Sequence, residues 1–315
     1  MEAQDALIVV DHVTRLYGPN TAVRDLSFQL RRGEVVGFLG PNGAGKSTTM
    51  QMITGNLAPS AGRITVGGAD ILDEPVAAKA RLGYLPEQPP LYRELTVDEY
   101  LRFCARLNRI PRPEVKEAVA RAKARCGLEA MGRRLIGNLS KGYQQRVGIA
   151  QAIIHQPDVV ILDEPTVGLD PIQIREIREL IRELGRDHSV ILSTHILPEV
   201  QSVCDRVLII NRGELVFDDR IEALTRRMQT SALVVALKRP PALGELEELP
   251  GVSAVEVLAE GRFRLHHAPE LSPAEAVAAA ACRGDWGLFE LTPERLSLED
   301  VFVNLTCEEP TGEAA

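Results

Sequence analysis

One glycine-rich octapeptide constrains the fold more than any other part of the chain. Gly-Pro-Asn-Gly-Ala-Gly-Lys-Ser occupies residues 40–47, directly after the apolar run 35–39, and helix-forming residues follow it. Loops of this pattern join a strand to a helix and turn successive backbone N–H groups toward phosphate oxygens. Lys46 can then reach the outer phosphates of a nucleotide, and the Ser47 hydroxyl can bind Mg²⁺. We therefore expect a phosphate loop formed by Gly40, Pro41, Asn42, Gly43, Ala44, Gly45, Lys46, Ser47 and Thr48.

A second segment supplies the carboxylates that such a loop needs. Residues 159–162 are apolar and lead into Asp163 and Glu164. We expect Asp163 to join the Mg²⁺ shell and Glu164 to polarise the attacking water as a general base. A strand that simply ends in two acids beside Pro165 is the alternative, and the phosphate loop weighs against it.

The order of the expected elements predicts an α/β core. Between residues 140 and 213 helices alternate with apolar strands at 159–164, 189–195 and 206–213, which indicates a parallel sheet covered on both faces. Short alternating segments from residue 7 to 38 predict a small β layer, and a strand pair is expected around 62–67. Helices over 96–107 and 114–126, separated by two prolines, predict a helical insert.

The carboxy-terminal part differs in charge from the rest. Of a net charge of -8, residues 241–315 carry 15 acidic and 4 basic side chains, a balance that repels nucleic-acid backbones. We place a domain boundary after residue 228, so that residues 229–315 form a small α+β domain. Its expected strands lie near 232–237, 253–258 and 262–266, and its expected helices over 272–282 and 298–305.

The chain shows no sign of export or of membrane spanning. No apolar stretch approaches the roughly 18–20 residues of a membrane helix, and the first eleven residues lack a signal-peptide pattern. The five cysteines are scattered without a CxxC pair, so we expect neither a disulfide framework nor a zinc site. A basic run over residues 101–134, with ten Arg or Lys against three Glu, is either a solvated helix face or a surface attracted to anionic lipid.

With one further motif the chain comes to resemble the ATP-binding subunits of ABC transporters, over residues 7–225. Ser140 can cap a helix whose free N–H groups form a second anion site. The fragment Leu139, Ser140, Lys141, Gly142 and Tyr143 is similar to the signature loop of that family, normally Leu-Ser-Gly-Gly-Gln. Lysine replaces the first glycine and tyrosine the glutamine, and such departures are typical of subunits of ABC-2 type exporters.

The resemblance implies roles for three more residues. Tyr17 matches the aromatic residue that stacks on adenine, although a packed tyrosine at a strand end is the alternative. Asp170 matches the loop that contacts the partner subunit, and it can also cap the helix that begins at Pro171. His195 matches the histidine that contacts the γ-phosphate.

The family's glutamine loop is expected between residues 84 and 92. Counting back from Leu91 and Tyr92 assigns Glu87 to the glutamine position, whereas residue type favours Gln88. Glu87 would add a carboxylate to the Mg²⁺ shell. Both assignments remain open at this point.

The resemblance implies an ATP hydrolase that drives a separately encoded ABC-2 type permease from the cytoplasmic face of the membrane. Its fold would combine a mixed sheet core, an antiparallel β subdomain and a helical subdomain over about 96–150. ATP and Mg²⁺ would lie between the phosphate loop of one chain and the signature loop of another, in a homodimer or with a paired ABC subunit. The alternatives are a soluble ABC ATPase acting on nucleic acid or ribosomes, and a silent ATP-binding module. The acidic tail argues against the first, and Glu164 and His195 against the second.

Overall fold

The computed structural model describes residues 6–268 and 271–295. The chain divides into two compact units, residues 1–221 and 222–315, whereas the sequence placed the boundary after residue 228. Among the described residues, no helix has the length and apolar character needed to cross a membrane.

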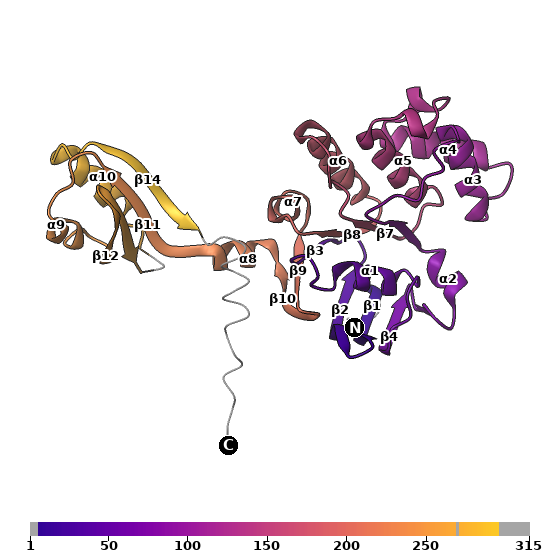
Figure 1. Cartoon of the computed structure of the whole chain (residues 1–315), viewed down its shortest axis with the longest axis horizontal. Helices are drawn as coiled ribbons and strands as arrows, with labels where there is room; N and C mark the ends of the chain where they lie inside the picture. The colour runs from indigo at the N-terminus through magenta and orange to yellow at the C-terminus, as the bar shows by residue number, and fades with distance from the viewer. Residues whose placement is uncertain (1–5, 269–270, 296–315) are drawn as a thin grey trace, which may run out of the picture. The chain divides into compact units, whose positions relative to one another are not determined.

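A mixed sheet of six strands forms the centre of the first unit (Figure 1). Five strands are parallel, and the edge strand β10 runs antiparallel to β9. Residues 35–39 were expected in the small β layer, but they form β3, a central strand of this sheet. All five residues are buried, which is typical of a parallel strand with both faces of its sheet covered. The sequence did not predict β6 or β10. In spatial order the strands are β10 (Glu214–Arg220), β9 (Arg206–Asn211), β3 (Val35–Leu39), β8 (Ser189–Thr194), β7 (Val159–Asp163) and β6 (Leu82–Leu85).

One face of this sheet is covered by an antiparallel sheet and by helix α1 (Lys46–Ile53), which packs between the two sheets. Apolar side chains of both sheets and of α1 form one continuous core, with Phe38, Met50 and Ile191 fully buried in it. The antiparallel sheet is the expected small β layer. Its strands, in spatial order, are β2 (Asn20–Arg31), β1 (Ala6–Tyr17), β4 (Ala61–Val66) and β5 (Ala69–Asp70).

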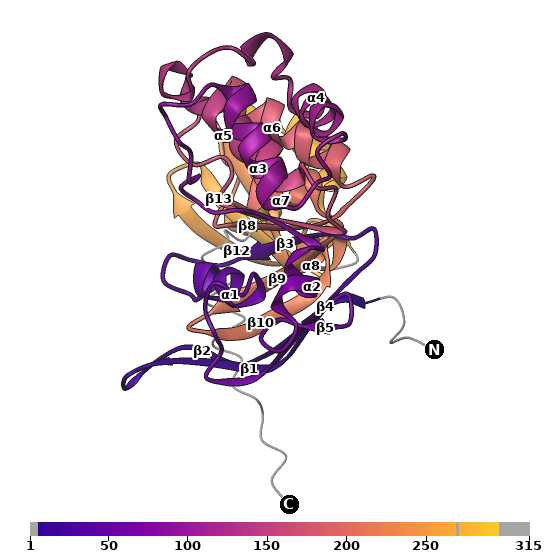
Figure 2. The same cartoon turned by 90° about the vertical axis from the view of Figure 1, so that its right-hand side faces the viewer.

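Helices α5 (Lys141–Ile153), α6 (Pro171–Leu184) and α7 (Leu197–Val203) cover the opposite face (Figure 2). The expectation that both faces of the sheet are covered is therefore confirmed. Helices cover this face, whereas the antiparallel sheet and α1 cover the other. Close approach of α7 depends on Gly37 of β3, where a Cβ atom would lie 2.9 Å from Cγ2 of Val200.

The helical segment consists of α3 (Val97–Leu107) and α4 (Val115–Cys126), which pack on each other and on α5. Thr96 begins α3 with a capping box, because its hydroxyl accepts from the N–H of Glu99 and that side chain accepts from Thr96 N–H. The segment leaves and rejoins the core at one place. Thr96 and Leu135 form an isolated bridge, and the N–H of Val97 donates to the carbonyl of Arg134 at 3.1 Å. A short helix, α2 (Pro75–Lys79), was not expected.

The second unit has a βαββαβ order with the strands arranged β12-β13-β11-β14, all antiparallel. Apolar residues such as Leu233 and Leu265 face its two main helices, while Arg264 on β13 pairs with Glu256 and Glu294. The expected strands and the helix over 272–282 are present, α9 and β14 are additions, and the helix expected over 298–305 lies outside the described residues. The elements are α8 (Ile221–Met228), β11 (Gln229–Leu237), α9 (Leu243–Glu247), β12 (Val252–Ala259), β13 (Arg262–His267), α10 (Ala274–Arg283) and β14 (Leu288–Arg295).

Candidate functional site

The phosphate loop connects the carboxyl end of β3 to the first residue of α1. Gly43 and Gly45 adopt φ angles of 80° and 108°, which favour glycine. The loop is also tightly enclosed, since a Cβ atom at Gly45 would lie 2.7 Å from the carbonyl oxygen of Ala22. The resulting turn leaves the first N–H groups of α1 at the loop, where the helix dipole favours an anion.

Lys46 is held at the centre of this loop. Its side chain is 6% exposed, and its Nζ donates to the carbonyl oxygens of Gly40 at 2.8 Å and Pro41 at 3.2 Å. The same nitrogen lies 3.6 Å from Oε1 of Glu164. The loop carbonyls and this carboxylate therefore place the ammonium group where it faces both the loop and the end of β7.

Asp163 ends β7 beside the loop and is 2% exposed. Burial raises the pKa of its carboxyl, the hydroxyls of Ser193 and Ser47 act in the opposite direction, and the charges of Glu164 and Glu87 raise it further. Oδ1 is buried without a hydrogen-bond partner in the described part of the chain. A buried, unpaired carboxylate oxygen near a serine hydroxyl is a donor set that suits Mg²⁺.

Glu164 and His195 meet across the ends of β7 and β8. The N–H of Glu164 donates to the carbonyl of Ser193 at 2.8 Å, and Nδ1 of His195 lies 3.0 Å from both carboxylate oxygens. Because an ionised carboxylate only accepts hydrogen bonds, the shared proton belongs on Nδ1. The backbone of Glu164 has a φ of 48°, a left-handed conformation that non-glycine residues adopt at a cost.

Lys46, Glu164 and His195 line one cavity of about 420 Å³, the phosphate cavity, whereas Asp163 is not part of its lining. Glu87 lies in its wall and Gln88 does not. Tyr17 is also outside the lining; it ends β1, is 46% exposed, and has the Arg15 guanidinium 4.7 Å from its ring centre. The cavity is lined by Ala22, Asn42, Gly43, Gly45, Lys46, Ser47, Thr48, Glu87, Glu164, Val167 and His195.

Three of the signature-loop residues, Ser140, Gly142 and Tyr143, line a separate pocket of about 260 Å³, the signature pocket, together with Asp170. The Ser140 hydroxyl accepts from the N–H of Tyr143 at 3.4 Å, and Asp170 accepts from the N–H groups of Ile172 and Gln173. Both serine and aspartate therefore cap helices, as their local sequence indicated. None of the six residues named from this motif and its partner loop lines the phosphate cavity of the same chain: Leu139, Ser140, Lys141, Gly142, Tyr143 and Asp170.

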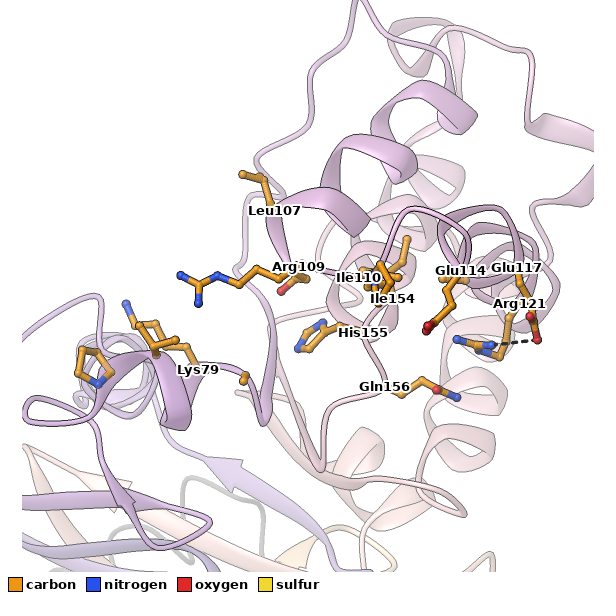
Figure 3. Close-up of a pocket in the computed structure, with 16 residues that line it drawn as sticks. Lys79, Leu107, Arg109, Ile110, Glu114, Glu117, Arg121, Ile154, His155 and Gln156 are labelled. Atoms are coloured by element: carbon orange, nitrogen blue, oxygen red, sulfur yellow. Dashed lines mark ion pairs between the residues drawn. The ribbon is translucent and has the colours of Figure 1, made fainter.

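A third and larger hollow of about 870 Å³, the side groove, lies between α2, the end of α3 and the start of α4 (Figure 3). Val76 and Leu107 are 59% and 65% exposed there. Figure 3 shows His155 near its centre, with Lys79 and Arg109 on one side. Burial lowers the pKa of His155, whose Nε2 lies 3.0 Å from the carbonyl oxygen of Leu82.

Sequence reasoning missed one buried carboxylate next to the site. Glu199 on α7 is 1% exposed and accepts from the hydroxyls of Thr166 and Thr194. These threonines stand two residues after Glu164 and one before His195. An acidic residue at a buried position of a short helix indicates a buried polar contact, but the sequence does not identify the partners of that residue.

Comparison with known proteins places this geometry in a family. The family model described as ABC transporter matches residues 23–167. Linearmycin resistance ATP-binding protein LnrL of Bacillus subtilis (strain 168) is 33% identical over 318 residues, covering 95% of this chain and 98% of the relative. Nod factor export ATP-binding protein I of Rhizobium leguminosarum bv. viciae is 35% identical over 298 residues, covering 94% of each.

Solved structures agree with the sequence comparison. The structure of an ATP-binding subunit of an ABC transporter is 32% identical and superposes with a TM-score of 0.64, covering 70% of this chain and 92% of that one. The resemblance drawn from the motifs is confirmed, as is the expected α/β fold. The chain belongs to the family of ABC transporter ATP-binding proteins, whose members bind and hydrolyse ATP.

Proposed function

We propose that this chain is the ATP-hydrolysing subunit of an exporter whose permease is a separate membrane protein of the ABC-2 type. The observation that carries the proposal is the convergence of Lys46, Glu164 and His195 in the wall of the phosphate cavity, with Asp163 beside Ser47 of the phosphate loop. The relatives named for linearmycin resistance and Nod factor export support the exporter class.

In this proposal Glu164 accepts a proton from water as the water oxygen attacks the γ-phosphorus, and the bond to the ADP oxygen breaks. His195, 3.0 Å from the carboxylate, holds the base in place and faces the γ-phosphate. Lys46 and the N–H groups of α1 stabilise charge on the phosphate oxygens. Ser47, Asp163 and Glu87 would hold Mg²⁺, which neutralises phosphate charge when bound.

A second chain would complete the site. A phosphate loop leaves the γ-phosphate open on one side, and Ser140 and Gly142 lie at the N-terminus of α5 in the signature pocket. Two chains placed head to tail would bring that helix N-terminus to the γ-phosphate of the partner's ATP, with Asp170 at the contact. Tyr17 would stack on adenine with the face that Arg15 leaves open.

The side groove is the proposed contact for the permease. Exposed Val76 and Leu107 offer apolar area. The charged lining residues are of both signs: Lys79, Arg109, Arg121, Glu114 and Glu117. Tyr92, five residues after Glu87, makes an edge-on contact with Phe103 of α3 at 5.6 Å between ring centres. A permease segment in this groove would thus lie one short stretch of chain from the phosphate cavity, on the cytoplasmic face of the membrane.

The test is to measure ATP turnover and to purify the chain from membranes with its bound partner. We expect Mg²⁺-dependent turnover that Lys46→Ala abolishes, and co-purification of a permease that Leu107→Asp prevents while basal turnover stays. Leu243→Asp, at a residue that is 46% exposed in the second unit, is the matched control. Turnover that responds to nucleic acid or ribosomes, with no membrane partner, would favour the soluble alternative.

A further inference from the structure

A carboxylate that does not line the phosphate cavity connects the two chain segments that carry Glu164 and His195. Glu199 of α7 is 1% exposed. Its Oε1 accepts from the hydroxyl of Thr166, and its Oε2 accepts from the hydroxyl of Thr194 at 2.9 Å. Nη2 of Arg178 on α6 lies 3.7 Å from Oε1.

Each threonine is fixed to a residue of the cavity through short stretches of backbone. The N–H of Val167 donates to the carbonyl of Glu164 at 3.3 Å, so Thr166 lies inside a tight turn that begins at Glu164. Thr194 immediately precedes His195, and its hydroxyl also accepts from the N–H of Ile196 at 3.2 Å. A movement of either hydroxyl therefore changes the distance between the Glu164 carboxylate and the His195 ring.

The chemistry of this contact suits a carboxylate. Two hydroxyl donors and a guanidinium converge on Glu199, and a carboxylate offers them two acceptor oxygens and a negative charge. Thr166 is 3% and Thr194 0% exposed, so water cannot replace a lost partner. Glutamine at this position would turn an N–H₂ group toward one hydroxyl and leave Arg178 without its anion.

We propose that Glu199 is a positioning residue that fixes Glu164 against His195 by holding Thr166 and Thr194 together. The inference rests on the proposed function, in which Glu164 is the base. It predicts a defect in the rate of hydrolysis rather than in ATP binding, because the phosphate loop is held by other contacts, such as Lys46 to Gly40 at 2.8 Å. Misplacement of a reacting group by about 1 Å costs on the order of 100-fold in rate.

The experiment compares variants that remove the bonds with variants that keep them. Glu199→Gln, Thr166→Val and Thr194→Val should lower kcat about 10- to 100-fold, with KM for ATP within about twofold of wild type. Thr166→Ser retains the hydroxyl and should therefore keep most of the wild-type rate. The matched control is Asp70→Asn, since Asp70 is 6% exposed and accepts from Nε of Arg63 at 2.6 Å, on a different sheet. It should lower the urea midpoint without changing kcat.

A second readout follows His195 directly. The ¹⁵N chemical shifts of its ring, assigned with His195→Gln, should move in Glu199→Gln and Thr166→Val and stay in place in Thr166→Ser and Asp70→Asn. Wild-type kcat and ring shifts in folded Thr166→Val and Glu199→Gln, while Glu164→Gln is inactive, would overturn the positioning role. If Glu164→Gln is itself fully active, Glu164 is not the base and that part of the proposed function fails, whereas the ring shifts still decide whether Glu199 positions His195.

Discussion

The phosphate cavity and the signature pocket are built in opposite ways. Three charged groups at or beside the cavity are buried: Lys46 at the start of α1 and Asp163 and Glu164 at the end of β7 are at most 6% exposed. In the pocket the functional groups belong to the first turns of α5 and α6, and Tyr143 and Ile172 are 37% and 73% exposed.

The difference indicates that the phosphate cavity and the signature pocket have different roles in the proposed function. Buried charge is costly, and clustered buried charges are common where a reacting group is bound, so the proposed chemistry belongs to the cavity. Helix N-termini capped by Ser140 and Asp170 need no buried charge to attract an anion, so the pocket can contribute recognition from an exposed surface. Under the proposed head-to-tail arrangement, each half lacks what the other supplies.

The largest expected effect is at Glu164. Glu164→Gln should keep ATP binding and lower hydrolysis by roughly 10² to 10⁴, because the amide cannot accept the proton. ATP turnover and nucleotide binding should be measured together, with light scattering to detect a lasting dimer with ATP but not with ADP. Glu214→Gln, a carboxylate that is 53% exposed, is the control. Unchanged turnover in Glu164→Gln would remove this residue from the mechanism.

The second prediction separates the cavity from the pocket. Neither Lys46→Ala nor Gly142→Asp should hydrolyse ATP alone, since a Cβ at Gly142 already lies 2.6 Å from Oε1 of Gln173. An equal mixture should recover about a quarter of the wild-type rate, because a mixed dimer contains one intact site.

The matched control for this mixture is Gly244→Asp, where nothing lies within 4 Å of the added Cβ; it should be fully active by itself. Full activity of Gly142→Asp alone would show that the signature pocket takes no part in hydrolysis.

A third prediction concerns the wall of the cavity. Glu87 lines it and Gln88 does not, so Glu87→Ala should weaken Mg²⁺-dependent hydrolysis by about tenfold and Gln88→Ala should have little effect. Glu87→Gln should be mild, because it keeps the size and an acceptor oxygen. A Mg²⁺ titration of turnover checks this, and a crippled Gln88→Ala beside a normal Glu87→Ala would shift the glutamine-loop assignment by one residue.

The smallest effect is on stability. Burial raises the pKa of Asp163, so the folded chain binds this proton more tightly than the unfolded chain, and ionisation costs stability as pH rises above the unfolded value. Asp163→Asn removes that cost and should raise Tm at pH 7 by roughly 2–4 °C, the shift that about 1 kcal/mol produces in a domain of this size, while abolishing turnover. Thermal unfolding from pH 3 to 8 should show the advantage vanishing in acid. A lower Tm at pH 7 would contradict it.

Local signals in the sequence were sufficient for the elements that depend on neighbouring residues. The capping threonine at residue 96, the serine at 140 and the aspartate at 170 each stand where a helix begins. The pairing of strands that are distant in the sequence could not be predicted from such local signals. Residues 35–39 pair with strands more than 150 residues away, and the four-residue strand Leu82–Leu85 has no pattern of its own.

The same contrast between local signals and long-range contacts holds for the candidate site. The motifs identified Lys46, Asp163, Glu164 and His195 singly, and the strand order β3-β8-β7 explains why they meet. Counting back from Leu91 and Tyr92 favoured Glu87 and residue type favoured Gln88, and Glu87 is the one that lines the cavity. Glu199 was missed because its partners lie on two other segments of the chain.

The two ends of the helical segment are joined by hydrogen bonds, and this affects how the sequence of the segment can vary. Residues 97–134 leave and return at the bridge between Thr96 and Leu135, so their length and surface can vary while the strands of the sheet keep their register. Part of the side groove belongs to this excursion, at Leu107 and Arg109. Under the proposed permease contact, transplanting this segment from a relative should change which membrane partner binds while Lys46, Glu164 and His195 keep their places in the phosphate cavity.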